Sequence, residues 1–177
     1  MIKKIALYLI LFLFTTLPLV TAQSIDQTLS TVNFSISNFK VNTVDGAFKK
    51  MDGEINFNAE NLNSSNFNVC ISAASIFTDN EKRDEHLRNE DFFDVKKFPT
   101  ICFISNDIRK TDNGYESNGK LTLHGITKVV TIDFNKDKNS FTGQLNINRL
   151  DFNLGEDTGT FTVGNEVEIE IKCVLKE

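Results

Sequence analysis

The stretch Val167–Leu175 (VEIEIKCVL), close to the C-terminus, decides the fold class. Apolar residues occupy every second position, and charged residues occupy three of the four positions between them. Because successive side chains of a β-strand point to opposite faces, this alternation predicts a strand with one face in a core and the other in water. Cys173 falls in phase with the apolar residues, so we expect its thiol to be buried.

The same alternation recurs along the chain. It is present in Thr31–Ser37, Gly53–Ala59, Asn66–Ala74, Thr100–Asn106, Tyr115–His124, Lys128–Asn135 and Ser140–Ile147. Residues typical of turns lie between these segments, at Val44–Gly46, Asp52–Gly53, Asp112–Gly114, His124–Gly125, Lys136–Asn139 and Val163–Asn165. About eight short strands at regular spacing predict an all-β barrel or sandwich. No linker or internal repeat interrupts them, so we expect a single domain over residues 23–177.

Residues 1–22 carry the pattern of a signal peptide. Two lysines precede the apolar run Ile5–Leu19, and Val20–Ala22 has the small residues that signal peptidase accepts. We expect cleavage after Ala22 and export of the remainder; the alternative is an uncleaved membrane anchor. The run has about 15 residues, whereas a bilayer helix needs roughly 20. No later stretch approaches that length, so we expect no stable membrane insertion of the mature chain.

The composition excludes several classes of function. The chain has 24 acidic and 19 basic residues, a net charge of −5, and so lacks the basic excess that favours nucleic-acid binding. It has only two histidines, His86 and His124, so we expect no metal site. The G-x-S-x-G pattern of a serine nucleophile, paired histidines and a glycine-rich phosphate loop are all absent from the sequence, and we expect no catalytic residues.

The three cysteines, Cys70, Cys102 and Cys173, cannot all pair within one chain. Strand alternation places Cys70 and Cys102 on the face opposite their apolar neighbours. They could form a disulfide if their strands are antiparallel neighbours; the alternative is two free thiols. An exported protein meets an environment that permits disulfides.

Phenylalanine dominates the expected interior. The sequence contains 16 Phe and no Trp. In a small barrel of about eight strands, the inward side chains either fill the interior or surround one ligand. Phe supplies large apolar area for both arrangements, so periodicity alone leaves the two open.

One segment, Asp79–Lys97, is highly charged and lacks the alternation. We expect a short helix over Glu81–Asn89, capped by Asp79 or Asn80. Connections of this length inside a compact β domain are often functional.

The charged residues of this segment include Arg83, Asp84 and His86. They could contact a ligand head group, carry acid–base chemistry at His86, or anchor the loop through salt bridges. Arg149 follows an apolar strand, and we expect it to pair with Asp151 or an aspartate of residues 79–97, in preference to a ligand.

Several motifs resemble the YceI-like family in the same order. They are Gly46–Phe48, Gly53–Phe57, the region Ser75–Ser105 (SIFTDNEKRDEHLRNEDFFDVKKFPTICFIS), Gly119–Lys128 (GKLTLHGITK), Arg149–Asn153 and Val163–Val167. The resemblance covers about residues 30–174. Four positions depart from it. Asn89 and Phe98 stand where the family has Ser and Tyr, which are mild changes. Leu150 and Asn153 stand where the family has Ser and Gly, and Asn tolerates the left-handed backbone that Gly adopts.

The resemblance implies an eight-stranded antiparallel lipocalin-like barrel with one short helix in residues 79–97. It implies an elongated apolar cavity that holds a polyisoprenoid chain, as a prenyl pyrophosphate or a prenylated quinone. It further implies a bacterial periplasmic or secreted protein, often a homodimer, that binds an isoprenoid lipid and no other cofactor.

We therefore expect a lipid carrier without enzymatic activity. The first alternative is a structural or interaction module with a packed core, and the second is an enzyme acting on an isoprenoid lipid at residues 79–97. The expected cavity residues are Phe34, Ile36, Phe57, Phe67, Val69, Ile71, Phe103, Leu121, Leu123, Ile132, Phe141, Ile169 and Ile171. The expected head-group or loop-anchoring residues are Arg83, Asp84, His86 and Arg149.

Overall fold

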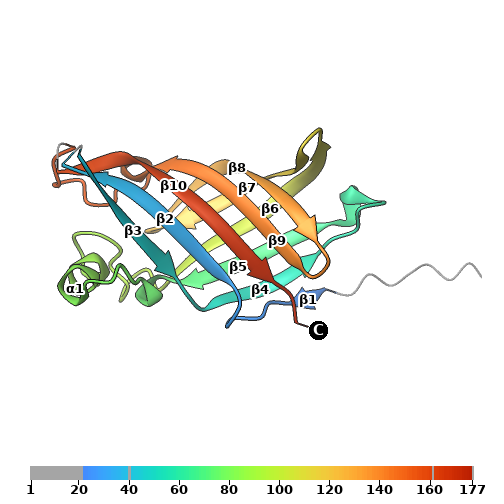
Figure 1. Ribbon diagram of the computed structural model, residues 1–177, viewed down its shortest axis with the longest axis horizontal. Helices are drawn as coiled ribbons and strands as arrows, with labels where there is room; N and C mark the ends of the chain where they lie inside the picture. The colour runs from blue at the N-terminus through green and yellow to red at the C-terminus, as the bar shows by residue number, and fades with distance from the viewer. Residues whose placement is uncertain (1–21, 40, 161, 177) are drawn as a thin grey trace, which may run out of the picture.

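The computed structural model describes residues 22–39, 41–160 and 162–176, and in these residues ten antiparallel strands form one sheet (Figure 1). The predicted signal peptide, residues 1–22, therefore lies outside the described residues except for its last position. The strands are β1 (Gln23–Ser24), β2 (Thr31–Asn38), β3 (Asn42–Phe48), β4 (Met51–Asn56), β5 (Asn66–Ser72), β6 (Thr100–Thr111), β7 (Gly114–Leu123), β8 (Ile126–Asp137), β9 (Ser140–Asn148) and β10 (Val163–Val174). The helices are α1 (Glu81–Arg88) and the 3-10 turns η1 (Leu62–Ser64), η2 (Ala73–Ser75) and η3 (Arg149–Phe152).

The connection between β3 and β4 forces the sheet to curl. The strand order is β1-β4-β5-β6-β7-β8-β9-β10-β2-β3, so β3 lies at one edge and β4 lies next to the other. Only Lys49 and Lys50 join these two strands. Since each residue spans at most about 3.5 Å, the two edges must meet there. The result is an antiparallel lipocalin-like barrel, which confirms the predicted fold class with ten strands in place of eight.

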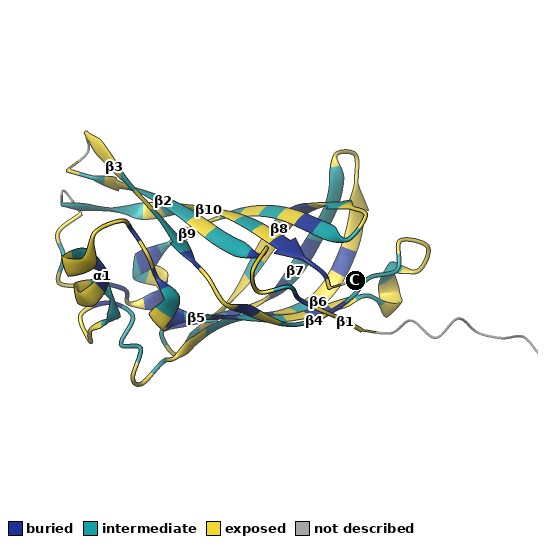
Figure 2. Ribbon diagram, turned by 60° about the horizontal axis from the view of Figure 1, so that its bottom comes forward, coloured by how far each residue is buried: buried dark blue, intermediate teal, exposed yellow. Residues whose placement is uncertain are grey.

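The alternation in β10 has the predicted consequence. From Glu166 to Lys172, residues of even number are exposed and residues of odd number are partly buried, as Figure 2 shows along the strand. Cys173 is buried, as predicted. β10 pairs with β9 on one side and with β2 on the other, so its inward side chains lie in the centre of the wall.

Three of the predicted turns were wrong, because their glycines serve other purposes. Gly46 lies within β3, where an added Cβ would stand 2.3 Å from the ring of Phe34. Gly53 lies within β4 at φ 134°, against the backbone of β5. Gly164 lies in β10, where the register shifts between Val163 and Val167. A glycine inside a strand marks a close approach or a bulge as readily as a turn.

The predicted turn at His124–Gly125 is correct. These two residues connect β7 to β8, with φ of 51° and 75°. Positive φ at both central positions is typical of the type I′ turn, whose twist matches that of antiparallel strands.

Helix α1 begins as the sequence predicts. The Asn80 side chain caps it by accepting a hydrogen bond of 3.1 Å from the backbone N–H of Arg83. Asp84 is buried and accepts hydrogen bonds from the backbone N–H and the hydroxyl of Thr78, at 2.9 and 2.5 Å. These bonds hold the helix against the connection that precedes it, so Asp84 anchors the segment.

Cys70 and Cys102 form a disulfide, which resolves the alternative that the sequence left open. They are direct partners in the register of β5 and β6, and their Cα atoms are 4.1 Å apart. Cys173 is the free cysteine. The bridge joins positions 32 residues apart and so restricts the unfolded chain considerably.

We expect the double variant Cys70→Ser/Cys102→Ser to fold with a free energy of unfolding lower by roughly 3–4 kcal/mol, because the unfolded chain regains the entropy of that loop. Urea unfolding with and without reductant measures the difference. Reductant should destabilise the wild type by a similar amount and leave the double variant unchanged. Equal stability of the two proteins without reductant would show that the bridge contributes nothing.

Candidate functional site

A cavity of about 500 Å³ occupies the interior of the barrel. The inward side chains of β2–β10 form its walls, and those from the α1 segment and the loop after η3 form its mouth. Most of these side chains are apolar. In Figure 1, α1, the β2–β3 connection and the loop after η3 lie at the same end of the barrel. The interior is therefore only partly filled by its own side chains.

The structure places nearly all of the predicted cavity residues on this wall. Those that line it are Phe34, Ile36, Phe67, Val69, Ile71, Phe103, Leu121, Leu123, Ile132, Phe141, Ile169 and Ile171. Phe57 does not line it. β4 ends at Asn56, so the alternation that the sequence shows does not extend to Phe57 in the structure.

Phe57 instead belongs to an aromatic cluster at the end of the barrel away from α1. Its ring centroid lies 5.1 Å from that of Tyr115, 5.4 Å from Phe141 and 6.0 Å from Phe134, each edge to face. Phe67 packs against Phe134 and Phe141 in the same cluster. Edge-to-face packing at these distances is favourable, so the rings close this end of the cavity.

Sequence reasoning missed several residues of the wall and mouth. They are Val32, Val44, Met51, Ile76, Leu87, Phe92, Phe93 and Leu154. Phe92 and Phe93 lie in the segment that the sequence marks mainly by its charge. The ring of Phe93 meets that of Phe48 edge to face at 5.4 Å, so this segment contributes apolar surface as well as charge. The adjacent Phe92 and Phe93 are the feature of the sequence that could have indicated this apolar surface.

Three of the four predicted polar residues, Arg83, His86 and Arg149, belong to the lining of the cavity, and Arg83 and His86 lie at its mouth. Arg83 donates from Nε to the Thr78 hydroxyl at 2.8 Å and from Nη2 to the Thr78 carbonyl at 2.7 Å. Its Nη1 has no hydrogen-bond partner among the described residues. Asp84 is not part of the lining, because its carboxylate is buried and accepts hydrogen bonds from Thr78.

His86 lies at the outer edge of the mouth, and its side chain is 56% exposed. Its Nδ1 stands 3.9 Å from the Asp91 carboxylate, and its ring packs edge to face on Phe92. The distance to Asp91 exceeds that of a hydrogen bond. His86 and the Nη1 of Arg83 thus offer polar groups to a ligand in the mouth.

Arg149 is 2% exposed and anchors the loop after η3. Its guanidinium donates to five backbone carbonyls at 2.6 to 3.3 Å, those of Leu154, Gly155, Thr158, Val163 and Gly164. The predicted pairing with an aspartate was therefore wrong. Burial lowers the pKa of Arg149. All five N–H groups of a guanidinium are used here, so Arg149 has none left to donate to a ligand.

Asn153 ends η3 with φ 54° and ψ 32°, the left-handed conformation. This is the position at which the family resemblance predicted Gly and at which Asn was expected to substitute. The left-handed residue turns the chain into the loop that Arg149 holds.

Cys173 also lines the cavity. Burial raises the pKa of its thiol to about 11. At neutral pH it is therefore a protonated, apolar part of the wall and a poor nucleophile.

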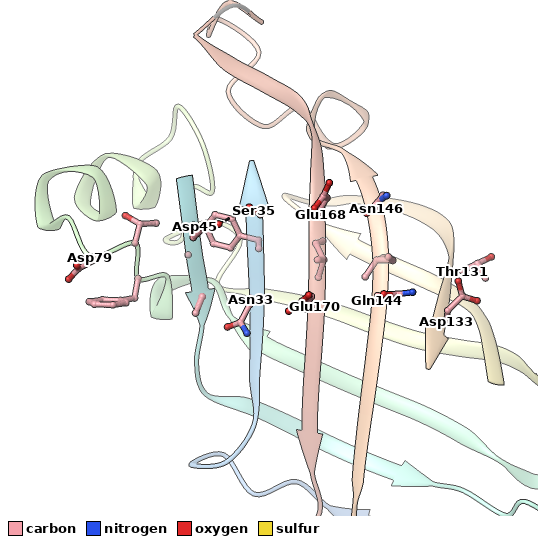
Figure 3. Close-up of a pocket in the computed structure, with 17 residues that line it drawn as sticks. Asn33, Ser35, Asp45, Asp79, Thr131, Asp133, Gln144, Asn146, Glu168 and Glu170 are labelled. Atoms are coloured by element: carbon pink, nitrogen blue, oxygen red, sulfur yellow. Dashed lines mark hydrogen bonds between the residues drawn. The ribbon is translucent and has the colours of Figure 1, made fainter. Parts of the chain in front are cut away.

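A second hollow, of about 860 Å³, lies on the outer face of the sheet and is polar (Figure 3). Its labelled side chains come from β2, β3, β8, β9 and β10 and from Asp79. Five of its lining residues are carboxylates, and Lys and Arg are absent from the lining. Ser35 donates to Asp45 at 2.6 Å within it. This surface does not suit an apolar or anionic ligand.

Across the described residues, no cluster of three or more His, Cys, Asp or Glu side chains has the arrangement of a metal site. In the same residues, no helix has the length and apolar character needed to cross a bilayer.

We expect Arg149→Lys to lower the free energy of unfolding by about 2–4 kcal/mol, because one ammonium cannot replace five bonds to partly buried carbonyls. Thermal and urea unfolding measure the change. Arg109→Lys is the matched control, since Arg109 is 64% exposed and faces Asp107 and Glu116 on the surface. Similar small losses in both variants would contradict an anchoring role for Arg149.

The comparisons with known proteins agree with this geometry. The YceI-like domain model matches residues 23–175. Protein YceI of Salmonella newport (strain SL254) is 33% identical over 156 residues, which cover 82% of this chain and 82% of that protein. The crystal structure of Burkholderia cenocepacia BcnA superposes with a TM-score of 0.78 at 28% identity, covering 86% of this chain and 99% of that one.

Two further structures share the fold. The Campylobacter jejuni YceI protein has a TM-score of 0.67 at 28% identity and covers 77% of this chain and 87% of its own. A polyisoprenoid binding domain from Saccharophagus degradans has a TM-score of 0.68 and covers 88% and 98%. Its 18% identity shows a common fold alone. From the family match over nearly all of the described residues and from the Salmonella relative, the chain belongs to the YceI-like family.

Proposed function

We propose that the protein binds an isoprenoid lipid in the barrel cavity and carries or stores it outside the cytoplasm. The observation that carries this proposal is a mainly apolar space of about 500 Å³ inside the barrel, with the polar side chains of Arg83 and His86 at its mouth. Ligand pockets usually enclose about 300–1,000 Å³ and are lined mainly by apolar groups with a few polar ones. A branched hydrocarbon chain suits such walls, and removing it from water is favourable by about 25 cal/mol per Å² of apolar area.

The family and the fold neighbour support the chemical class of the ligand. The Saccharophagus degradans domain with this fold is described as binding polyisoprenoids. In our proposal the hydrocarbon chain lies toward the aromatic cluster. The head group, a pyrophosphate or a quinone ring, lies at the mouth beside Arg83 and His86. Both residues retain donors there, and charge-assisted bonds from Arg suit a phosphate.

Export is supported by two features. The sequence predicts a signal peptide over residues 1–22, and Cys70 and Cys102 are bridged. Disulfides persist in the periplasm and outside the cell, where the environment is oxidising. A periplasmic or secreted setting is therefore part of the proposal. The homodimer implied by the family resemblance, and the absence of any cofactor besides the lipid, stay predictions.

We propose binding in preference to catalysis. Arg149 has all of its donors engaged, and the His86 ring lies beyond hydrogen-bond distance of the Asp91 carboxylate. A general base is usually oriented by such a bond. The cavity offers apolar walls for a hydrocarbon chain and polar groups at its mouth, and a lipid carrier needs both.

The cavity is tested by filling it. Ile132→Trp on β8 should lower the affinity for a long prenylated quinone at least tenfold, because the larger ring occupies space that the chain needs. Val129→Trp is the matched control, since Val129 lies on the same strand and is 70% exposed. Titration and mass spectrometry of organic extracts measure retained lipid. Wild-type protein that takes up neither prenylated quinones nor prenyl pyrophosphates would overturn the proposal and favour a structural module.

The head-group position is tested by comparing two ligands with the same chain. Arg83→Gln should weaken binding of a prenyl pyrophosphate at least tenfold and leave binding of the matching prenyl alcohol nearly unchanged. Loss of Arg83's bonds to Thr78 alone would change both affinities together. Equal weakening for the two ligands would thus assign Arg83 to anchoring the loop.

A further inference from the structure

The floor of the cavity, at the end of the barrel away from α1, consists of aromatic rings. Phe67, Phe134 and Phe141 line the cavity there, and all three are buried. The ring of Phe57 lies behind them, with its centroid 6.4, 6.0 and 5.4 Å from theirs. Phe57 does not line the cavity and is only partly buried, so its other side reaches the surface. At Phe57, a single ring therefore separates the cavity floor from the exterior.

Phe57 takes this position from a loop. It is the first residue after β4, in the connection to β5 that lies at the end of the barrel away from α1 (Figure 1). The Asn56 amide donates to the Ser64 carbonyl at 3.0 Å, and the Asn58 N–H donates to the Ser65 hydroxyl at 2.8 Å. These bonds on both sides of Phe57 fix the loop, so the ring is held across the end of the barrel.

The floor and the mouth differ in their chemistry, and this difference orients a bound lipid. Phenyl rings offer neither a hydrogen-bond donor nor an acceptor, so the floor suits the hydrocarbon end of a ligand. Arg83 and His86 offer polar groups at the mouth. A lipid whose two ends occupy these places has a chain as long as the distance between them.

The strands set that distance. On β7 the cavity lining runs from Ser117 to Leu123. These six steps cover about 20 Å along the strand, and about 15 Å along the barrel axis because barrel strands tilt by about 40°. An extended hydrocarbon advances about 1.2 Å per chain carbon, since a residue with three backbone bonds spans about 3.5 Å. The space between the floor and Leu123 therefore holds about twelve chain carbons, or about three isoprene units.

We propose that the floor formed at Phe57 sets the length of the lipid chain that the protein accepts, and that chains of about three to four isoprene units are preferred to much longer ones. This inference rests on the proposed function, because it concerns which isoprenoid the cavity holds. A chain that ends at the floor buries all of its units and leaves its head group beside Arg83 and His86. In a longer chain, the additional units stay outside the mouth in water, which is unfavourable.

The floor is tested by removing its outer ring. In the wild type, affinity should rise from geranyl to geranylgeranyl pyrophosphate and rise no further for solanesyl pyrophosphate, whose chain is much longer. Phe57→Ala opens the floor, so the affinity for solanesyl relative to geranylgeranyl pyrophosphate should increase at least tenfold. Competition between the two ligands, followed by mass spectrometry of the protein-bound fraction, measures this ratio. An unchanged ratio in Phe57→Ala would overturn the proposal.

Phe77→Ala is the matched control. It removes the same ring at a site that is 46% exposed and outside the lining of the barrel cavity. This variant should keep the wild-type ratio, and a tenfold increase in it would contradict a specific role for Phe57. Phe57→Leu leaves a smaller apolar side chain at the floor and should shift the ratio in the same direction by a smaller factor. If thermal unfolding shows that Phe57→Ala does not fold, an unchanged ratio in Phe57→Leu overturns the proposal instead.

The two proposals fail separately. Linear alcohols contain no isoprene unit, yet the same floor limits the length of their chains. If the wild type binds no prenyl ligand, the proposed function is overturned, and the linear alcohols still test the floor. Affinity that stops rising at a longer chain in Phe57→Ala than in the wild type supports the floor, and the same limit in both proteins overturns it. Prenyl binding with an unchanged length preference in Phe57→Ala would overturn only the chain-length proposal.

Discussion

The passage from β3 to β4 is the constraint on which the rest of this structure depends. Lys49 and Lys50 alone connect a strand at one edge of the sheet to a strand beside the other edge. The three Cα–Cα steps from Phe48 to Met51 reach about 11 Å at most, so the sheet must curl until its ends lie close together. Hydrogen bonds between neighbouring strands then satisfy most of the backbone along the wall, from β4 through β10 and β2 to β3. The interior does not have to be filled to provide those bonds, and a cavity is tolerated.

The two ends of the barrel differ in their chemistry. At one end, rings that include Phe57, Tyr115 and Phe134 pack edge to face and close the interior. At the other end, the buried guanidinium of Arg149 donates hydrogen bonds to the backbone carbonyls of a loop that is not paired with a strand. Arg83 and His86 add polar groups at that mouth. An apolar space with a single polar edge orients an amphipathic ligand, and this asymmetry links the fold to the proposed carrier function.

Prediction from sequence succeeded where the signal was local. The alternation in β10 and the Asn80 cap of α1 each depend on residues a few positions apart. It failed where the reason lay in a distant strand. Gly46 resembles a turn residue until the ring of Phe34 is found against it, and Phe57 remains in phase with its strand although the strand has already ended. The sequence led us to expect a carboxylate partner for Arg149, because side-chain types are what a sequence displays. Its partners are backbone carbonyls, whose positions depend on the path of the loop.

The sequence by itself determined which face of each strand is apolar, where the short helix begins, and which family the chain resembles. The alternation of apolar residues along a strand and the residue that caps a helix both depend only on positions close together in the sequence. Only the tertiary structure decided that Cys70 meets Cys102, that Arg149 anchors a loop and that about 500 Å³ of the interior is empty. The first two depend on the register and loop path between segments far apart in sequence. The third depends on the difference between the volume that the curled sheet encloses and the volume of its side chains, and no local pattern encodes that difference.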